Sequence, residues 1–159
     1  MRERRLALVL DRVGGPCLRT RLVITAGLLF LLGWQVGYVA AAPPHYTHAE
    51  ILAAIRTIES GGRDDPPDGD DGDAIGPYQI HRPYWEDSGI GGDYQDCRRR
   101  EYAERVIVAF MRRHVPKAWG ARHAEVIART HNGGPRGRHK ATTDGYWARV
   151  EGRLRKQRR

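Results

Sequence analysis

The sequence predicts a mainly α-helical domain with at most one small β-hairpin. Four segments repeat apolar residues three or four positions apart, the spacing that places them on one face of a helix. Glycine and proline clusters separate these segments, and no stretch shows the sustained apolar alternation of a long strand. About 115 residues follow the apolar N-terminal stretch, which is enough for one domain with a single modest core.

The N-terminal segment, residues 1–42, differs from that domain in composition. Six arginines precede an apolar stretch from Leu22 to Ala42, which ends in small residues. A basic front, an apolar middle and a small-residue end are typical of a secretory signal peptide, and a stretch of about 20 residues can also serve as a retained membrane anchor. Both interpretations predict export, to the periplasm or out of the cell. Any membrane contact is expected only through this segment, and residues 43–46 form a linker.

The first helix of the domain is predicted from about His48 to Glu59. Thr47 followed by Glu50 matches a capping box, and apolar residues recur at positions 51, 52, 55 and 58. Gly61 and its glycine neighbour end the helix. Residues 63–73 are rich in aspartate and turn-forming residues, which predicts a loop that can enclose a small hairpin.

Further helices follow at shorter intervals. They are a short helix from Pro83 to Asp87, a long helix from about Cys97 to Val115 ended by Pro116, a shorter one from Ala121 to Thr130, and a last one capped by Thr142 to Asp144. The last helix carries apolar residues at positions 146, 147, 150 and 154. We therefore expect residues 47–152 to form the domain and residues 153–159 to form a basic tail.

Charge and cysteine content restrict the partners and the environment. The chain has 27 Lys and Arg against 19 Asp and Glu, a net charge of +8. Without residues 1–42, 21 basic and 17 acidic residues remain, a net charge of +4. A positive net charge can attract an anionic cell-wall polymer or nucleic acid. Because the domain is expected to be exported, the cell-wall polymer is the favoured partner. Cys17 lies in the signal region, so the cleaved domain has Cys97 alone and can form no intrachain disulfide.

A pair of carboxylates in unlike surroundings is the main candidate for chemistry. Glu59 ends an amphipathic helix beside Ile58, where a half-buried carboxyl is suited to donate a proton. The loop that follows supplies acids in a polar setting, although each of them can also be a simple turn former. These are Asp64, Asp65, Asp68, Asp70, Asp71 and Asp73. One protonated and one ionised carboxyl are what glycoside hydrolysis needs.

Metal sites and other hydrolase sites match the sequence less well. Counted from Asp68, Gly72 takes the fifth place and Gln79 the twelfth, which does not fit an EF-hand. The histidines lack the paired spacing of zinc motifs, and no Gly-x-Ser-x-Gly segment is present. We therefore predict neither a metal nor a cofactor.

Four short motifs, in this order, resemble those of the invertebrate-type lysozymes, the destabilase family, including its bacterial relatives. They are Ile58-Glu59-Ser60-Gly61-Gly62, Gly76-Pro77-Tyr78-Gln79-Ile80 with Tyr84-Trp85, His131-Asn132-Gly133-Gly134-Pro135, and Gly145-Tyr146-Trp147. The resemblance implies a lysozyme-like fold. It also implies a muramidase that cuts the β-1,4 bond between N-acetylmuramic acid and N-acetylglucosamine, with peptidoglycan as its partner.

The resemblance implies roles for individual residues. Glu59 takes the place of the catalytic general acid, and Asp70 best fits that of the catalytic aspartate, with Asp71, Asp68 and Asp73 left as alternatives. Six residues are implied as substrate-binding, although each can instead be architectural: Ser60, Tyr78, Gln79, His131, Asn132 and Gly133.

Two departures and two rival functions accompany the resemblance. Animal members are rich in disulfides, whereas this domain has one cysteine. The serine and lysine of the isopeptidase activity described for some members have no match here. A lytic transglycosylase needs only the acid, and a non-catalytic peptidoglycan-binding module needs neither carboxylate. Nothing in the sequence predicts an oligomeric state.

Overall fold

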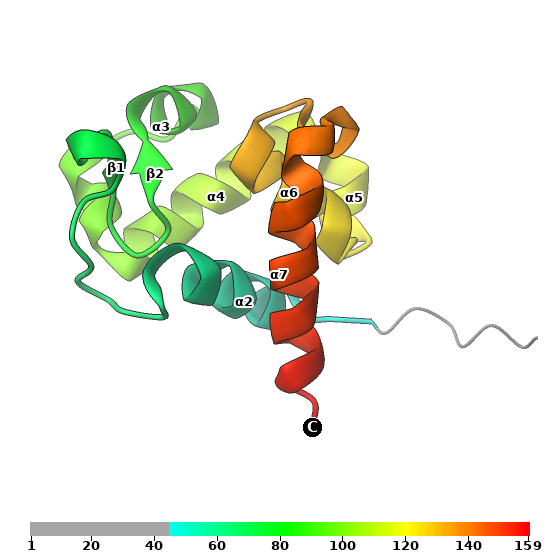
Figure 1. Cartoon of the computed structure of the whole chain (residues 1–159). Helices are drawn as coiled ribbons and strands as arrows, with labels where there is room; N and C mark the ends of the chain where they lie inside the picture. Colours follow the sequence, from blue (N-terminus) through cyan, green and yellow to red (C-terminus); the bar gives the residue numbers. More distant parts are fainter. Residues whose placement is uncertain (1–44) are drawn as a thin grey trace, which may run out of the picture. The chain divides into compact units, whose positions relative to one another are not determined.

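The computed structural model describes residues 45–159, which are mostly helical, with one small two-stranded antiparallel sheet at one side beside α3 and α4 (Figure 1). The elements are α2 (His48–Ser60), η1 (Asp70–Gly72), β1 (Ala74–Ile75), β2 (Ile80–His81), α3 (Arg82–Ser88), η2 (Tyr94–Arg98), α4 (Arg100–His114), α5 (Pro116–Gly120), α6 (Ala124–Gly133), η3 (Gly137–His139), η4 (Ala141–Thr143) and α7 (Asp144–Lys156). The predicted helical fold with a small hairpin is confirmed. The predicted signal or anchor segment lies outside the described residues.

Helix α2 begins and ends where the sequence predicts, within one residue. The Thr47 hydroxyl accepts from the backbone N–H of Glu50 (3.2 Å), and the Glu50 carboxylate accepts from the backbone N–H of Thr47 (2.7 Å), which completes the capping box. Gly61 ends the helix in the left-handed conformation, with φ +67°. Glu59 is therefore fixed in the last turn of a well-formed helix.

The long helix predicted from Cys97 to Val115 is two elements in the structure. Asp93 and Asp96 form a capping box of their own, which closes the separate 3₁₀ turn η2. Arg99 is extended, with φ −85° and ψ 125°, so α4 begins only at residue 100. Pro116 ends α4 as predicted, and it also opens the short helix α5.

The last two helices are shifted relative to their predicted bounds. Helix α6 begins at residue 124, three residues later than predicted, and continues to Gly133. Helix α7 extends to Lys156, beyond the expected domain end at residue 152, because Val150 and Leu154 are fully buried on its inner face. Most of the expected tail, residues 153–156, therefore belongs to this helix.

The turn between β1 and β2 is tight and packs closely against η2. Ile75 pairs with Ile80, and the backbone N–H of Gln79 donates to the Gly76 carbonyl (3.0 Å). Gly76 has φ +71°, and a Cβ there would lie 2.1 Å from the Cys97 carbonyl oxygen. Only glycine therefore allows the turn to pack so closely on η2.

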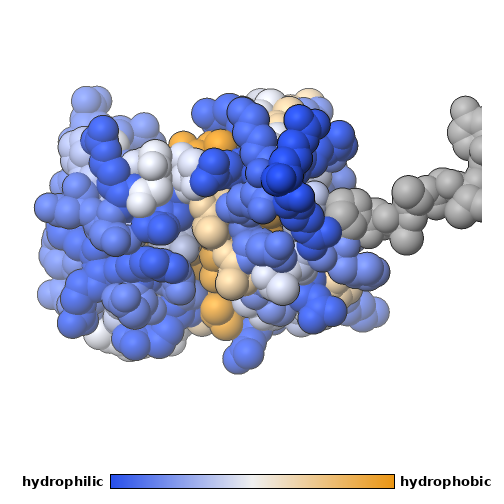
Figure 2. Space-filling model, turned by 90° about the horizontal axis from the view of Figure 1, so that it is seen from below, coloured by the Kyte–Doolittle hydropathy of each residue, from blue (hydrophilic) through white to orange (hydrophobic). Residues whose placement is uncertain are grey.

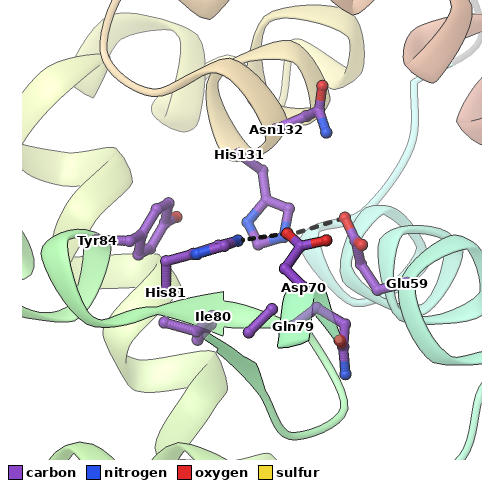
Figure 3. A pocket seen from close by; sticks show the side chains of 9 residues that line it. Glu59, Asp70, Gln79, Ile80, His81, Tyr84, His131 and Asn132 are labelled. Atoms are coloured by element: carbon purple, nitrogen blue, oxygen red, sulfur yellow. Dashed lines mark ion pairs between the residues drawn. The ribbon is translucent and has the colours of Figure 1, made fainter. Parts of the chain in front are cut away.

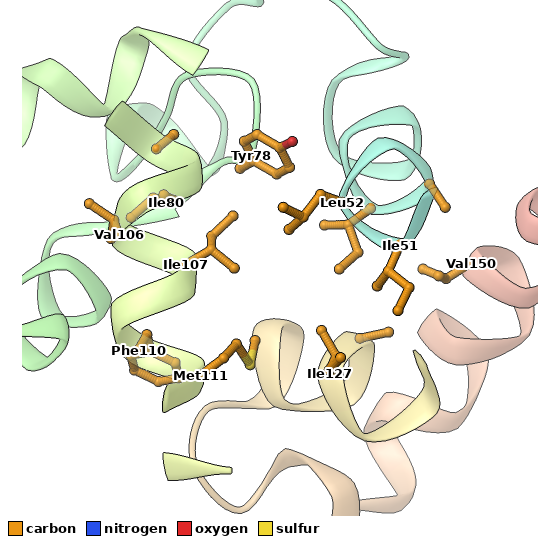
Figure 4. Packing of buried hydrophobic residues seen from close by; sticks show 14 of the residues in the cluster. Ile51, Leu52, Tyr78, Ile80, Val106, Ile107, Phe110, Met111, Ile127 and Val150 are labelled. Carbon is orange, nitrogen blue, oxygen red and sulfur yellow. The ribbon is translucent and has the colours of Figure 1, made fainter. Parts of the chain in front are cut away.

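The core joins the hairpin to the helices without a disulfide. Figure 4 shows apolar side chains of α2, α4, α6 and α7 meeting in one cluster. The cluster includes Ile51, Leu52, Tyr78, Ile80, Val106, Ile107, Phe110, Met111, Ile127 and Val150. Each fully buried aliphatic or aromatic side chain contributes about 1.5 to 3 kcal/mol through the hydrophobic effect. This packing holds the elements that carry the polar site in fixed positions.

The face of the molecule seen from below is predominantly hydrophilic. Seen from below, one hydrophobic band crosses a face that is otherwise covered by hydrophilic residues (Figure 2). Within residues 45–159, no helix has both the length and the apolar content needed to cross a membrane.

Candidate functional site

A polar cleft of about 310 Å³ lies where α2, the η1 loop, the hairpin and α6 meet. Figure 3 shows Glu59 entering it from α2, Asp70 from the η1 loop and His131 from α6. The lining residues are Glu59, Asp70, Ala74, Gln79, Ile80, His81, Tyr84, His131 and Asn132. Segments far apart in the sequence thus supply one site.

The Glu59 side chain is largely enclosed, with 19% of it exposed. Its Oε1 accepts a hydrogen bond of 2.6 Å from the Tyr146 hydroxyl, which comes from α7. The Nε2 atom of His131 lies 3.6 Å from the same oxygen. A carboxyl in such an enclosed, hydrogen-bonded position is suited to general acid catalysis.

His131 is a buried, neutral neighbour of this carboxyl. Desolvation lowers the pKa of His131, while the Glu59 charge and a backbone hydrogen bond at Tyr78 oppose the shift. The Tyr84 ring lies edge-on to the imidazole, with ring centroids 5.5 Å apart. The Nδ1 atom of His131 and the hydroxyl of Tyr84 are buried without a hydrogen-bond partner among residues 45–159.

Asp70 stands in a contrasting, open environment, with 72% of its side chain exposed. The loop that carries it is closed by a pair of backbone hydrogen bonds between Gly69 and Ala74, of 2.9 and 3.1 Å. Asp70 and Asp71 both have positive φ, of 48° and 55°, a conformation that aspartate tolerates better than most residues. The His81 Nε2 atom lies 3.0 Å from Asp70 Oδ2.

The other aspartates of this loop segment have different surroundings. Asp68 is held by a bidentate contact with Arg98, whose guanidinium lowers the pKa of that carboxyl. Asp64 pairs with Arg56 at 2.6 Å. Neither of these two lines the cleft, and neither do Asp71 and Asp73. Asp70 is thus the loop aspartate that shares the cleft with Glu59.

Gln79 and Asn132 lie in the cleft wall, where the resemblance implies them. Gln79 has φ +47°, and its side-chain amide donates to the Gly76 carbonyl (3.0 Å). A Cβ at Gly69 would lie 2.3 Å from the Gln79 Oε1 atom. The absence of a side chain at Gly69 therefore makes room for Gln79 against the loop that carries Asp70.

Three other residues implied as substrate-binding have architectural surroundings instead. Tyr78 is fully buried, with its hydroxyl donating to Glu104 (2.7 Å), so its ring belongs to the core and not to the cleft lining. The Ser60 hydroxyl donates back to the Arg56 carbonyl (3.0 Å) at the end of α2. Gly133 packs against Thr143, where a Cβ would meet the Thr143 methyl at 2.7 Å.

Sequence reasoning missed site roles for His81, Tyr84 and Tyr146. His81 follows the buried Ile80 in β2, and strand alternation predicts an outward side chain there. In the sequence, Tyr84 is only a member of the second motif. The sequence pattern predicts Tyr146 only as an apolar residue of the last helix, and its contact with Glu59 spans 87 residues, which no local pattern reveals.

The arrangement fits two-carboxylate chemistry on a polar ligand. Glu59 is enclosed and bonded to a hydroxyl donor, whereas Asp70 is open to solvent and faces a histidine. Within residues 45–159, no group of three or more histidine, cysteine or acidic side chains is placed to hold a metal ion.

The chain is similar in sequence to lysozymes of invertebrates. It is 39% identical over 105 residues to lysozyme 1 of Crassostrea virginica, an alignment that covers 64% of this chain and 57% of that protein. It is 37% identical over 103 residues to the lysozyme of Meretrix lusoria, covering 63% and 84% of the two chains. The invertebrate-type lysozyme 2 of Caenorhabditis elegans is 34% identical, with coverage of 66% and 85%. No family model matches the chain.

The chain belongs to the invertebrate-type lysozyme family. The solved structures agree: the Meretrix lusoria lysozyme, in a complex with PliI of Aeromonas hydrophila, matches with a TM-score of 0.57 and 33% identity over 70% of this chain and 93% of that one. The Tapes japonica lysozyme matches with a TM-score of 0.55 and 31% identity over 69% and 92%. The lysozyme-like fold and the family resemblance are therefore confirmed, and membership places the chain among the lysozyme-type glycosidases.

Proposed function

We propose that this invertebrate-type lysozyme hydrolyses the β-1,4 bond between N-acetylmuramic acid and N-acetylglucosamine in peptidoglycan. Glu59 is the general acid, and Asp70 is the nucleophile or electrostatic stabiliser. The observation that carries the proposal is the meeting of these two carboxylates, one enclosed and one open, in a single polar cleft. Family membership supports the substrate class.

The two environments suit two different tasks. Glu59 donates its proton to the glycosidic oxygen while the bond to the anomeric carbon breaks. The Asp70 carboxylate, in the open loop, faces the positive charge that develops on the sugar. Gln79, His131 and Asn132 supply polar groups in the cleft wall that can hold sugar amides or hydroxyls.

Mass spectrometry of digested peptidoglycan tests the reaction type. Hydrolysis predicts fragments that end in reducing N-acetylmuramic acid. Anhydromuramic ends would instead indicate a lytic transglycosylase, which uses the acid but no water. Binding to peptidoglycan without any released fragment would indicate a non-catalytic module.

We also propose that the protein acts outside the cytoplasm, on the peptidoglycan of a cell wall. The composition of residues 1–42 supports export by a signal peptide or through a retained anchor. Sequencing the N-terminus of the mature protein distinguishes them, because cleavage predicts a start near residue 43 and an anchor predicts the full chain in the membrane fraction.

A further inference from the structure

Two buried groups converge on a single oxygen of Glu59. The Tyr146 hydroxyl lies 2.6 Å from Oε1, and the His131 Nε2 atom lies 3.6 Å from that same oxygen. Among residues 45–159, no group donates a hydrogen bond to Oε2. The two oxygens of this carboxyl are therefore not equivalent.

The position of Tyr146 is fixed by the packing of three helices. Helices α2, α6 and α7 contact one another, and Tyr146, Val150 and Leu154 are buried at four-residue spacing on the inner face of α7. At the start of α7, the Arg129 guanidinium bonds Thr143 (2.9 Å) and pairs with the carboxylate of residue 144 (2.7 Å). Tyr146 lies in the first turn of this clamped helix, and its ring is buried where α7 contacts α2.

We propose that Tyr146 is a positioning residue for Glu59 that holds Oε1 as a permanent hydrogen-bond acceptor and confines the transferable proton to Oε2. The inference rests on the proposed role of Glu59 as general acid. A proton on Oε1 would face the hydroxyl hydrogen of Tyr146, so the protonated carboxyl carries its hydrogen on the other oxygen.

The protonation states of both neighbours agree with this arrangement. Burial raises the pKa of Tyr146 well above its ordinary value, and the Glu59 carboxylate raises it further, so its hydroxyl keeps its proton. Burial lowers the pKa of His131, so the imidazole is a neutral neighbour. Neither group competes with Glu59 as the acid at neutral pH.

In the reaction, the Tyr146 hydroxyl stabilises the negative charge that Glu59 acquires when it gives up its proton. When the Oε2–H bond breaks, the proton goes to the leaving glycosidic oxygen, and that oxygen also takes the electron pair of its bond to the anomeric carbon. The carboxylate left behind carries a negative charge that the Tyr146 hydroxyl stabilises by a charge-assisted hydrogen bond. Water then releases the sugar and returns a proton to Oε2.

Other charged or titratable groups also surround Glu59, and the test must leave them in place. His131 comes from α6, and Arg149 of α7 lies over the Tyr146 ring, with its guanidinium carbon 5.6 Å from the ring centroid. Asp70 and His81 line the same cleft as Glu59. A substitution that removes only the Tyr146 hydroxyl leaves all four unchanged.

Tyr146→Phe is the test, with Tyr102→Phe as its matched control. Because a hydrogen bond to a charged group is lost, we expect kcat to fall about 10- to 100-fold. KM should change by less than about twofold, since the hydroxyl does not line the cleft. The alkaline limb of the pH profile should move to higher pH, because the ionised acid loses a stabilising donor.

Tyr102 is equally buried, and its hydroxyl donates to the Gly91 carbonyl (2.9 Å) outside the cleft. Its variant should keep the wild-type profile.

A wild-type kcat and alkaline limb in Tyr146→Phe would overturn the inference, as would an equal shift in Tyr102→Phe. The proposed function fails separately, if Glu59→Gln still cleaves peptidoglycan. Neutron diffraction of the wild-type protein gives the answer without a variant. Deuterium on Oε2 of the protonated Glu59 supports the inference, and deuterium on Oε1 contradicts it.

Discussion

Replacing Asp70 by asparagine should lower the turnover of the enzyme strongly and leave the stability of the fold nearly unchanged. The substitution removes one negative charge and keeps the size of the side chain, and asparagine tolerates the left-handed backbone at φ +48°. Both partners of the ion pair are exposed, with 72% of the Asp70 side chain and 47% of the His81 side chain accessible to solvent. Its loss should change the free energy of unfolding by less than about 1 kcal/mol.

The effect on turnover should be far larger. At a separation of about 4 Å and an effective dielectric constant of about 20, a carboxylate and a full positive charge interact by about 4 kcal/mol. Each 1.4 kcal/mol corresponds to about tenfold in rate, so kcat of Asp70→Asn should fall by about 1,000-fold. The assay is the initial rate at which reducing ends are released from peptidoglycan, with urea unfolding as the check on stability.

Asp71→Asn is the matched control for this experiment. Asp71 shares the loop and the left-handed backbone, with φ +55°, but does not line the cleft. We expect its kcat to stay within about twofold of the wild type, in line with the small effect of an exposed substitution. The reasoning is refuted if Asp70→Asn keeps more than a tenth of the wild-type kcat, or if Asp71→Asn loses as much activity.

Three further outcomes follow from the packing and the pKa shifts. Gly76→Ala should lower the free energy of unfolding in urea by about 2 kcal/mol or more, because of its positive φ and the close Cys97 carbonyl; an unchanged midpoint would contradict this. Burial lowers the pKa of His131 below its ordinary 6.5, so the unfolded chain binds a proton that the folded chain does not. The free energy of unfolding should therefore fall as the pH drops through 6.5, and His131→Gln should weaken that dependence. Burial raises the pKa of the Cys97 thiol to about 12, so iodoacetamide at pH 8 should label Cys97 only after unfolding, as peptide mass spectrometry can show.

The sequence predicts well those features that depend on neighbouring residues. Thr47 and Glu50 mark the start of α2 because a capping box is completed within four positions. The position of Glu59 in the last turn follows directly. The predicted start at Cys97 is wrong for α4, because a second capping box, between Asp93 and Asp96, competes with the apolar pattern that continues back to Cys97.

The parts of the site that the sequence does not predict depend on distant contacts. Tyr78 and Gln79 are neighbours in one motif, yet one side chain enters the core and the other enters the cleft wall, because the tight turn at Gly76 directs them apart. The sequence does not distinguish Asp70 from the other loop aspartates. Asp70 differs from them because it lines the cleft, and that cleft forms only when β2 and α6 lie beside the loop. The hydrogen bond from Tyr146 to Glu59 exists only once α7 has packed against α2.

The most direct test of the two-carboxylate account is the turnover of Glu59→Gln on peptidoglycan, measured together with binding. The substitution keeps the shape of the side chain and its acceptor for Tyr146 but removes the proton that the acid must donate. The account predicts that release of reducing ends is abolished while binding to peptidoglycan is preserved. Turnover within tenfold of the wild type would contradict it.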